Sequence, residues 1–107
     1  MSIAQADIDF ALELFGPLGG LTTRKMMGGL CIYHEGTIFA IIHGDGGIYL
    51  KAKGDLIADL EAEGAAQWTY SRDGQKTTGM PYWSLPEAAL DDPELACDWA
   101  RRALALL

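Results

Sequence analysis

The spacing of apolar residues predicts three helices, each with a recognisable start or stop. Ile8 and Phe15 lie on one face of the first, which Gly16-Pro17 ends, because glycine terminates helices and proline cannot continue them. In the last, Leu95, Trp99 and Leu106 share a face with Ala103. The predicted helices cover residues 3–15, residues 55–63 and the stretch that begins at Asp92-Pro93.

Between these helices the pattern changes to short runs rich in β-branched and aromatic residues. The first three lie close together in sequence, so they should pair as an antiparallel meander. The last contains Gly79 and Pro81, which predicts an edge or irregular strand. The fold class is therefore α+β, with an antiparallel sheet of about five strands flanked by helices in the order α-βββ-α-ββ-α. The five runs cover residues 25–33, 37–43, 48–53, 67–72 and 75–83.

Tight turns are predicted where glycine follows a polar residue between two runs. Glu35-Gly36, Asp73-Gly74 and the glycine-rich residues 44–47 all fit this description. The last stretch contains a G-x-G but has no following helix and no P-loop lysine, so it reads as a hairpin and not as a phosphate-binding loop.

The length and composition of the chain limit the classes of protein to which it can belong. The 107 residues suffice for one domain, 1–107, and no apolar run approaches the roughly 20 residues of a membrane span. Residues 1–9 contain two aspartates and no Lys or Arg, unlike a secretory or transit signal, so we expect a cytoplasmic protein without a membrane partner. Two cysteines, Cys31 and Cys97, are expected to be reduced, buried thiols.

The formal net charge of −7 argues against direct binding to duplex DNA, which depends on Lys and Arg. One alternative stays open: cations could gather beside Tyr49, Tyr70 and Tyr82 and bind single-stranded nucleic acid. A solvated sheet face balanced by nearby acids is the favoured interpretation. The cations concerned are Arg24, Lys25, Lys51, Lys53, Arg72 and Lys76.

No residue pattern marks a catalytic or cofactor site. The serines lie outside any G-x-S-x-G elbow, and neither C-x-x-C nor H-E-x-x-H occurs. Cys31 could act as a nucleophile with His34 or His43 as base, but strand alternation puts Cys31 and His34 on opposite faces. We therefore expect no enzyme activity, no catalytic residues, no metal and no cofactor.

Methionine and aromatic residues flank glycines in two separate stretches. Such residues usually build cores, but they also suit adaptable partner surfaces. If the two stretches lie side by side, they would form a docking or dimer surface. The hypothetical interaction surface consists of Arg24, Lys25, Met26, Met27, Gly28, Gly29, Met80, Tyr82 and Trp83.

Several short segments together match the pattern of a known family. Arg24-Lys25-Met26-Met27-Gly28-Gly29 is similar to the R-K-M-F-G-G signature of the TfoX N-terminal domain family, with Met27 in place of the usual phenylalanine. Leu30-Cys31 also departs from the family pattern. Further similar segments, in matching order, are Tyr33-His34-Glu35-Gly36, Ile48-Tyr49-Leu50-Lys51, Met80-Pro81-Tyr82-Trp83, Leu85-Pro86-Glu87 and Leu90-Asp91-Asp92-Pro93-Glu94.

The resemblance implies an antiparallel sheet flanked by helices, like that of secretion chaperones, and a link to the TfoX/Sxy regulators of competence genes. It implies no catalytic residues, and the chain reads as a stand-alone domain. The leading hypothesis is a non-enzymatic regulatory or adaptor module that binds a protein partner, such as transcription machinery or an activator, or forms a homodimer. The alternatives are a small-ligand-binding protein or cryptic enzyme with a cleft near Cys31, Tyr33 and Arg24, and a nucleic-acid-binding module.

Overall fold

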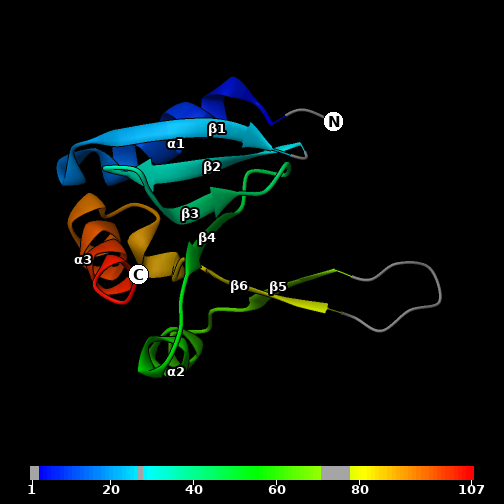
Figure 1. The fold of residues 1–107 in the computed structure, drawn as a ribbon, viewed down its shortest axis with the longest axis vertical. Helices are drawn as coiled ribbons and strands as arrows, with labels where there is room; N and C mark the ends of the chain where they lie inside the picture. The colour runs from blue at the N-terminus through cyan, green and yellow to red at the C-terminus, as the bar shows by residue number, and fades with distance from the viewer. Residues whose placement is uncertain (1–2, 27, 71–77) are drawn as a thin grey trace.

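The computed structural model describes residues 3–26, 28–70 and 78–107 (Figure 1). Within these residues the chain forms three α-helices, two short 3₁₀ helices and six strands, so the predicted α+β class is confirmed. The helical elements are α1 (Gln5–Phe15), η1 (Gly16–Leu18), α2 (Asp55–Ala62), η2 (Glu87–Ala89) and α3 (Pro93–Leu104). The strands are β1 (Leu21–Met26), β2 (Gly29–His34), β3 (Thr37–Ile42), β4 (Ile48–Lys51), β5 (Gln67–Tyr70) and β6 (Thr78–Ser84).

The sheet has the order β1-β2-β3-β4-β6-β5, and all neighbouring strands are antiparallel. The predicted meander is confirmed, but it has four strands and not three. The run predicted as one strand over residues 25–33 is two strands, because Gly28 adopts φ 83° and reverses the chain between Met26 and Gly29. Glycine adopts such positive φ values at no steric cost, so its presence marks a turn and not an interruption.

The prediction that the last strand is an edge or irregular strand is confirmed in its second form. β6 lies between β4 and β5, so it is an interior strand and β5 is the edge. It is irregular as predicted, since Gln67 pairs with Trp83 while Thr69 pairs with Gly79, which leaves extra residues on β6. Pro81 lies within this bulge, where the missing backbone N–H disturbs the ladder least.

Two predicted turns are confirmed and one lies outside the described residues. Glu35 and Gly36 both have positive φ, as a tight hairpin between β2 and β3 requires. Residues 43–47 close the β3–β4 hairpin, where the His43 N–H donates to the Gly47 carbonyl at 2.7 Å. The predicted Asp73-Gly74 turn falls in the segment that is not described.

The main hydrophobic core lies between one face of the sheet and the helices α1 and α3. Phe15 of α1 and Phe39 of β3 are fully buried and meet edge to face, with ring centroids 5.3 Å apart. The buried face of α3 differs from the prediction, because Leu95 and Trp99 are only half-buried and Leu106 is exposed. Its fully buried residues are small, which lets the helix approach the sheet and α1 closely: Ala96, Ala100 and Ala103.

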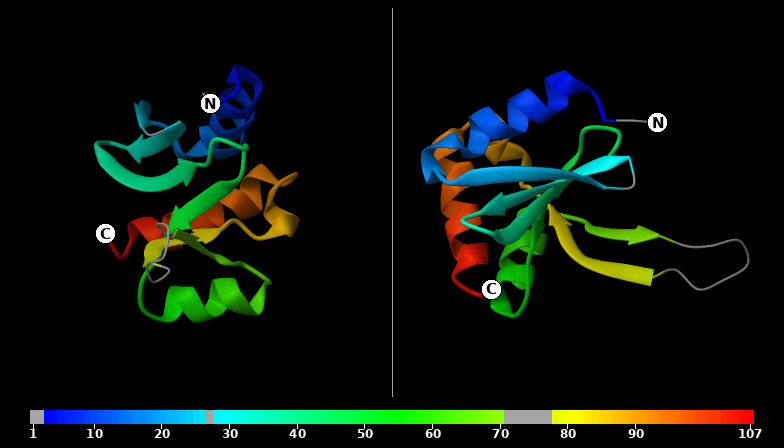
Figure 2. Two further views of the ribbon diagram at one scale, coloured as in Figure 1. Left: turned by 90° about the vertical axis from the view of Figure 1, so that its right-hand side faces the viewer. Right: turned by 45° about the horizontal axis from the view of Figure 1, so that its top comes forward.

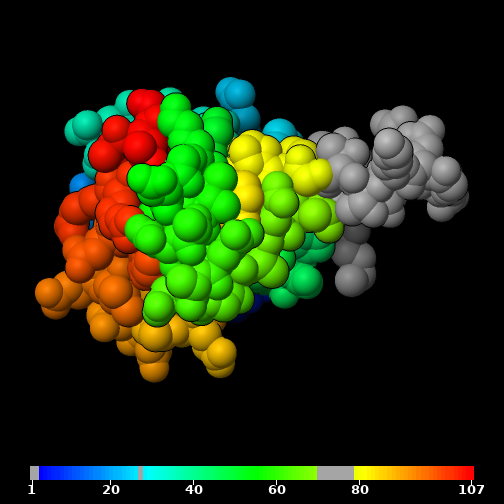
Figure 3. Space-filling model, turned by 90° about the horizontal axis from the view of Figure 1, so that it is seen from below, coloured from blue at the N-terminus to red at the C-terminus, as the bar shows by residue number. Residues whose placement is uncertain are grey.

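The pair β5–β6 projects from the rest of the sheet (Figures 1 and 2). Helices α1 and α2 lie at opposite ends of the molecule, and α2 lies between α3 and β5–β6 in the view of Figure 3. Trp83 of β6 forms a hydrogen bond with α2: its indole Nε1–H donates to a Glu61 carboxylate oxygen at 3.2 Å. Within the described residues, none of the helices has the length and apolarity needed to cross a bilayer.

Candidate functional site

The second face of the sheet carries a smaller hydrophobic cluster, and every member comes from a strand. Cys31, Ile41 and Tyr82 are buried in it, and partly buried side chains surround them. We call this cluster the aromatic face because tyrosine and tryptophan dominate it. It consists of Cys31, Tyr33, Ile38, Ile41, Tyr49, Trp68, Met80 and Tyr82.

Strand alternation and register place these side chains together. Residues directly opposite each other on neighbouring strands point to the same face of a sheet. Cys31 is opposite Ile41, and Ile41 is opposite Tyr49, so one row of the cluster crosses β2, β3 and β4. Because β3 contains a bulge, the neighbouring residues Phe39 and Ala40 both point into the main core. The residues on either side of them, Ile38 and Ile41, point to the aromatic face.

Trp68 lies at the centre of the aromatic contacts. Its ring centroid is 5.1 Å from that of His43, 5.5 Å from that of Tyr49 and 6.5 Å from that of Tyr82. Because Trp68 belongs to the edge strand β5, the projecting pair β5–β6 must curve toward the β3–β4 hairpin to make these contacts. The aromatic side chains therefore connect the two halves of the sheet.

Two cations border this face. Arg24 is opposite Cys31, and Lys51 is opposite Tyr82, so both point to the side of the aromatic cluster. Burial raises the pKa of the Cys31 thiol, and the positive charge of Arg24 offsets part of that rise. The pKa of Tyr82 is also raised, mainly by burial and to a lesser degree by Cys31 and Tyr33. Both groups are held in their neutral forms.

The interaction surface predicted from the sequence is not one surface. Its two stretches lie on β1 and β6, which β2, β3 and β4 separate by about 19 Å at ordinary strand spacing. Arg24, Lys25 and Gly28 are exposed, and Met26 is 52% exposed. Met27 lies outside the described residues.

Of the predicted residues on β6, only some belong to an accessible face. Tyr82 and the half-buried Met80 point to the aromatic face. Trp83 was misplaced by the prediction: it is 6% exposed and packs in the main core on the opposite face. Strand alternation separates Tyr82 from Trp83, so the two cannot serve the same surface.

The glycines of the Arg24–Gly29 motif have a backbone role. Gly28 supplies the positive φ of the β1–β2 turn. A Cβ atom at Gly29 would collide with the Ile42 carbonyl oxygen on β3, so only glycine fits there. These two positions shape the turn that presents Met26, and they are accounted for without a ligand.

Neither of the two imidazoles forms a hydrogen bond with Cys31 among the described residues. The Cys31 side chain is buried, with only 2% of its surface exposed. The two imidazoles have other neighbours: Nδ1 of His34 lies 2.8 Å from the Gly19 carbonyl oxygen, and Nδ1 of His43 lies 3.2 Å from an Asp45 carboxylate oxygen. A pocket of about 250 Å³ near Arg24 is lined by Thr22, Thr23, Arg24 and Tyr33, without Cys31. The two cysteines are free and buried, as predicted. Across the described ranges, no three His, Cys, Asp or Glu residues are grouped as metal ligands would be.

Sequence reasoning missed the central role of Trp68 and its contact with His43. The sequence contains part of the signal, because Tyr49 alternates with the apolar Ile48 and Leu50 and Trp68 alternates with polar residues, so each ring should point to one side of its strand. What the sequence did not disclose was that β5 lies beyond β6 and curves back toward the β3–β4 hairpin. His43 carried no signal of its own.

Charge is distributed very unevenly between helices and strands. Eleven of the fifteen carboxylates lie on helices or on residues directly next to them, against two of the eight Lys and Arg residues, which gives these segments a formal balance of −9. The carboxylates are Asp7, Asp9, Glu13, Asp55, Asp59, Glu61, Glu63, Glu87, Asp92, Glu94 and Asp98, and the cations are Arg101 and Arg102. Among the described residues, the other cations lie on strands or within two residues of a strand, and two of them border the aromatic face. These cations are Arg24, Lys25, Lys51 and Lys53, whereas Arg72 and Lys76 lie outside the described residues.

Comparison with known proteins agrees with the resemblance seen in the sequence. Residues 13–106 match the TfoX N-terminal domain. No curated protein matches the chain. The family match spans nearly all of the sequence, including all six described strands, α2 and α3, and it begins within the last turn of α1. The chain therefore belongs to the TfoX N-terminal domain family.

Proposed function

We propose that this protein is a non-enzymatic adaptor domain that binds a protein partner through its aromatic face. The observation that carries this proposal is the cluster around Trp68, which strands alone build and which helices do not cover among the described residues. Tyrosine, tryptophan and methionine are enriched at the centres of protein interfaces, because they bury a large area at a low cost in conformational entropy.

The charges at the border of this face indicate the chemistry of the partner. Arg24 and Lys51 flank an apolar centre, so a partner with acidic side chains around an apolar anchor would match it. Membership of the TfoX N-terminal domain family supports a partner in transcription control, such as an activator of competence genes. A homodimer through the same face is the other form that this association could take, and the cytoplasm is the compartment that fits both.

The state of the thiols supports a role without catalysis. A nucleophilic cysteine needs an accessible thiolate, and its pKa is normally lowered by a neighbouring base or cation. Burial raises the pKa of Cys31 and of Cys97 instead. Neither thiol forms a hydrogen bond with an imidazole within the described part of the chain, and Cys97 lies 3.6 Å from the Leu14 carbonyl oxygen.

Paired tryptophan variants test the proposal. Trp68→Ser removes the centre of the aromatic face, whereas Trp99→Ser removes a half-buried tryptophan of α3 that lies beneath the Arg102 guanidinium. Partner capture from the native cells by tagged protein, with quantitative mass spectrometry, and light scattering for self-association are the two measurements. We expect Trp68→Ser to reduce capture or dimerisation by about tenfold or more and Trp99→Ser to leave both near the wild-type value.

Circular dichroism serves as the folding control for both variants. If a folded Trp68→Ser protein captured the same partner at the wild-type level and kept the same oligomeric state, the aromatic face would have no part in binding.

A second candidate function, single-stranded nucleic-acid binding, is favoured by one observation. Arg24 and Lys51 share a face with tyrosine and tryptophan rings, which is the combination that such sites use. Titration with a labelled oligonucleotide at several salt concentrations tests it. Binding that weakens steeply with salt and is lost in Lys51→Ala would favour this function over a protein partner.

A further inference from the structure

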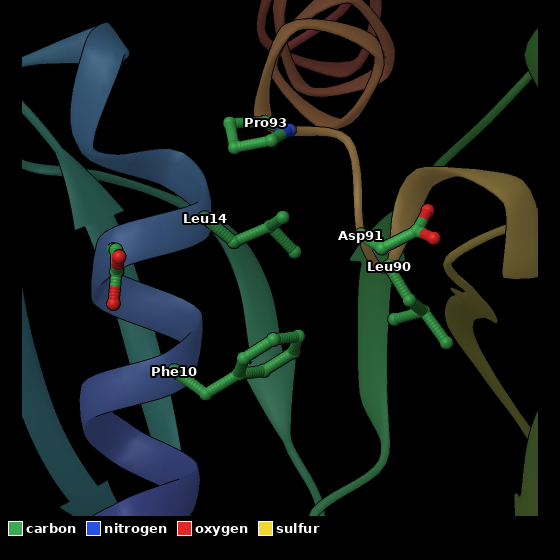
Figure 4. A pocket seen from close by; sticks show the side chains of 6 residues that line it. Phe10, Leu14, Leu90, Asp91 and Pro93 are labelled. Atoms are coloured by element: carbon green, nitrogen blue, oxygen red, sulfur yellow. The ribbon is translucent and has the colours of Figure 1, made fainter.

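A groove on the helical side of the protein has a lining unlike that of the aromatic face. One pocket of about 180 Å³ lies between α1 and the start of α3, and it is lined by Phe10, Glu13, Leu14, Leu90, Asp91 and Pro93. Figure 4 shows Phe10 and Leu14 extending from α1 across this pocket toward Leu90 and Pro93. Its floor is apolar and comes from two helices and the loop between η2 and α3.

A second pocket lies next to the first, and Leu90 lines both. This second pocket has a volume of about 390 Å³ and lies between the end of α2 and the segment that follows β6. Leu85 and Pro86 contribute apolar surface to it. We call the two pockets together the acidic groove, for the side chains described next.

Carboxylates line both pockets of the acidic groove. Glu13 and Asp91 line the first pocket, and Glu63 and Glu87 line the second. None of these four carboxylates has a salt-bridge partner within the described ranges, where the ion pairs of α2 and α3 use Asp59 and Asp98 instead. The groove therefore joins apolar surface to negative charge that is not neutralised locally.

Phe10 makes the first pocket a suitable anchor point. Its side chain is 47% exposed, whereas the side chains of Ile8 and Ala11 on the same helix are buried. A partner side chain placed against Phe10, Leu14 and Leu90 would remove apolar surface from water, which is favourable by about 25 cal/mol per Å². The first pocket, of about 180 Å³, has room for one or two side chains and is smaller than the roughly 300–1,000 Å³ of a typical small-ligand site. The second pocket, of about 390 Å³, is near the lower end of that range.

The geometry points to a second docking site: the acidic groove binds a cationic amphipathic segment of another protein, with apolar anchors in the two pockets and Lys or Arg side chains beside the four carboxylates. The match in charge selects this occupant, because alternating apolar and basic residues complement both parts of the lining. A second copy of the chain that docks through its own helical side is disfavoured, since the helical segments carry a formal balance of −9 and two such surfaces repel.

This inference goes beyond the proposed function, because it concerns the opposite side of the molecule and a partner of opposite charge. The probe for the test is a synthetic peptide of about 16 residues with leucine and lysine at helical spacing, and its control is the same peptide with glutamate in place of lysine. Amide chemical shifts of the isotope-labelled protein locate the site, and fluorescence polarisation gives the dissociation constant.

Two pairs of variants separate the groove from general attraction to an acidic protein. The pair Glu13→Gln and Asp91→Asn removes two charges from the groove, and the matched pair Asp9→Asn and Asp55→Asn removes two charges away from its lining. We expect the groove pair to raise the dissociation constant by about tenfold and the matched pair by no more than about twofold. Phe10→Ser, an exposed position that does not endanger folding, should also weaken binding by about tenfold.

Shift changes of the wild-type protein should centre on residues 10–14, 63–65 and 85–91. Equal weakening by the two charge pairs, absence of binding, or shifts centred on the aromatic face would each overturn the inference. So would concentration-dependent shifts at the groove without peptide, which would identify a second copy as the occupant. Failure here leaves the Trp68→Ser test untouched, because the two tests use different faces and different variants.

Discussion

The two faces of the sheet are both apolar, yet they are completed in different ways. The helices α1 and α3 seal one face around Phe15 and Phe39, which are fully buried. On the other face the strands bury only Cys31, Ile41 and Tyr82, and leave Tyr33, Tyr49, Trp68 and Met80 partly exposed. The apolar side chains of the helix-covered face are therefore fully buried within the protein itself. Those of the aromatic face are only partly buried.

This difference separates residues that stabilise the fold from residues that can also bind. A fully buried side chain contributes its whole transfer free energy to folding and cannot be offered to a partner. A half-buried aromatic side chain contributes part of it and retains apolar surface that a partner could bury. The faces should therefore respond differently to substitution, solvent access and pH.

The largest effect is expected in the sealed face. Phe39→Ala removes a fully buried ring that packs on Phe15, so the free energy of unfolding should fall by about 3–5 kcal/mol. Urea denaturation followed by circular dichroism measures this change. A loss below about 1 kcal/mol would mean that the helix-covered face is not the principal core.

A smaller loss of stability is expected in the aromatic face. Trp68→Ala removes ring contacts with His43 and Tyr49 from a half-buried position, and we expect a loss of about 1–2 kcal/mol in the same urea measurement. The loss should be smaller than that of Phe39→Ala. If the two variants lost equal free energy of unfolding, the two faces would not differ in this respect and Trp68 would be a core residue like Phe39.

The two cysteines allow the solvent access of the two faces to be compared, because replacing either with alanine changes the packing little. Cys31 belongs to the strand-only cluster, whereas Cys97 lies under α1, so exposing Cys31 requires a smaller local opening. In the single-thiol variants Cys97→Ala and Cys31→Ala, iodoacetamide should label Cys31 about tenfold faster than Cys97 under native conditions. Mass spectrometry of timed samples measures both rates, and faster labelling of Cys97 would contradict the expected order.

The smallest effect concerns the hairpin that supports His43. The Asp45 carboxylate accepts a hydrogen bond from the Gly47 N–H at 2.9 Å, and this bond, followed by the nearby His43, lowers the pKa of Asp45. A lowered pKa stabilises the folded state above the unfolded value of about 4, and that stability is lost as pH falls through the folded value.

Asp45→Ala should therefore cost less than about 1 kcal/mol at neutral pH, since the group is exposed, and the difference from wild type should shrink as pH falls below about 4. Thermal unfolding across this pH range checks both parts. A difference that grew toward low pH would show that the carboxylate does not act through its charged form.

Much of the fold could be predicted because local chemistry decides it. The Asp92 cap is an example, since its carboxylate accepts from the Leu95 N–H as the sequence suggests. The hairpin at residues 43–47 and the alternation that buries Ile48 and Leu50 are others. Each depends on residues within a few positions of one another, so the sequence displays it directly.

The candidate site could be predicted only in part. The sequence pointed to methionine and aromatic residues as binding groups, and Met80 and Tyr82 do lie on the aromatic face. It wrongly joined Met26 to β6 and wrongly included Trp83, because neither strand order nor the face of a side chain in a bulged strand follows from composition. Trp68 and His43 are neighbours only because β5 pairs beyond β6.

By itself, the sequence determined where helices begin, where hairpins turn and which family the chain resembles, since these depend on short-range bonds and on residue order. Tertiary structure decided that the glycines of the Arg24–Gly29 motif separate two strands, that β6 is an interior strand, and that the apolar residues divide between a sealed core and the aromatic face. The physical reason is that a sheet joins residues distant in the chain, so the environment of a side chain depends on strands and helices that its own segment does not encode.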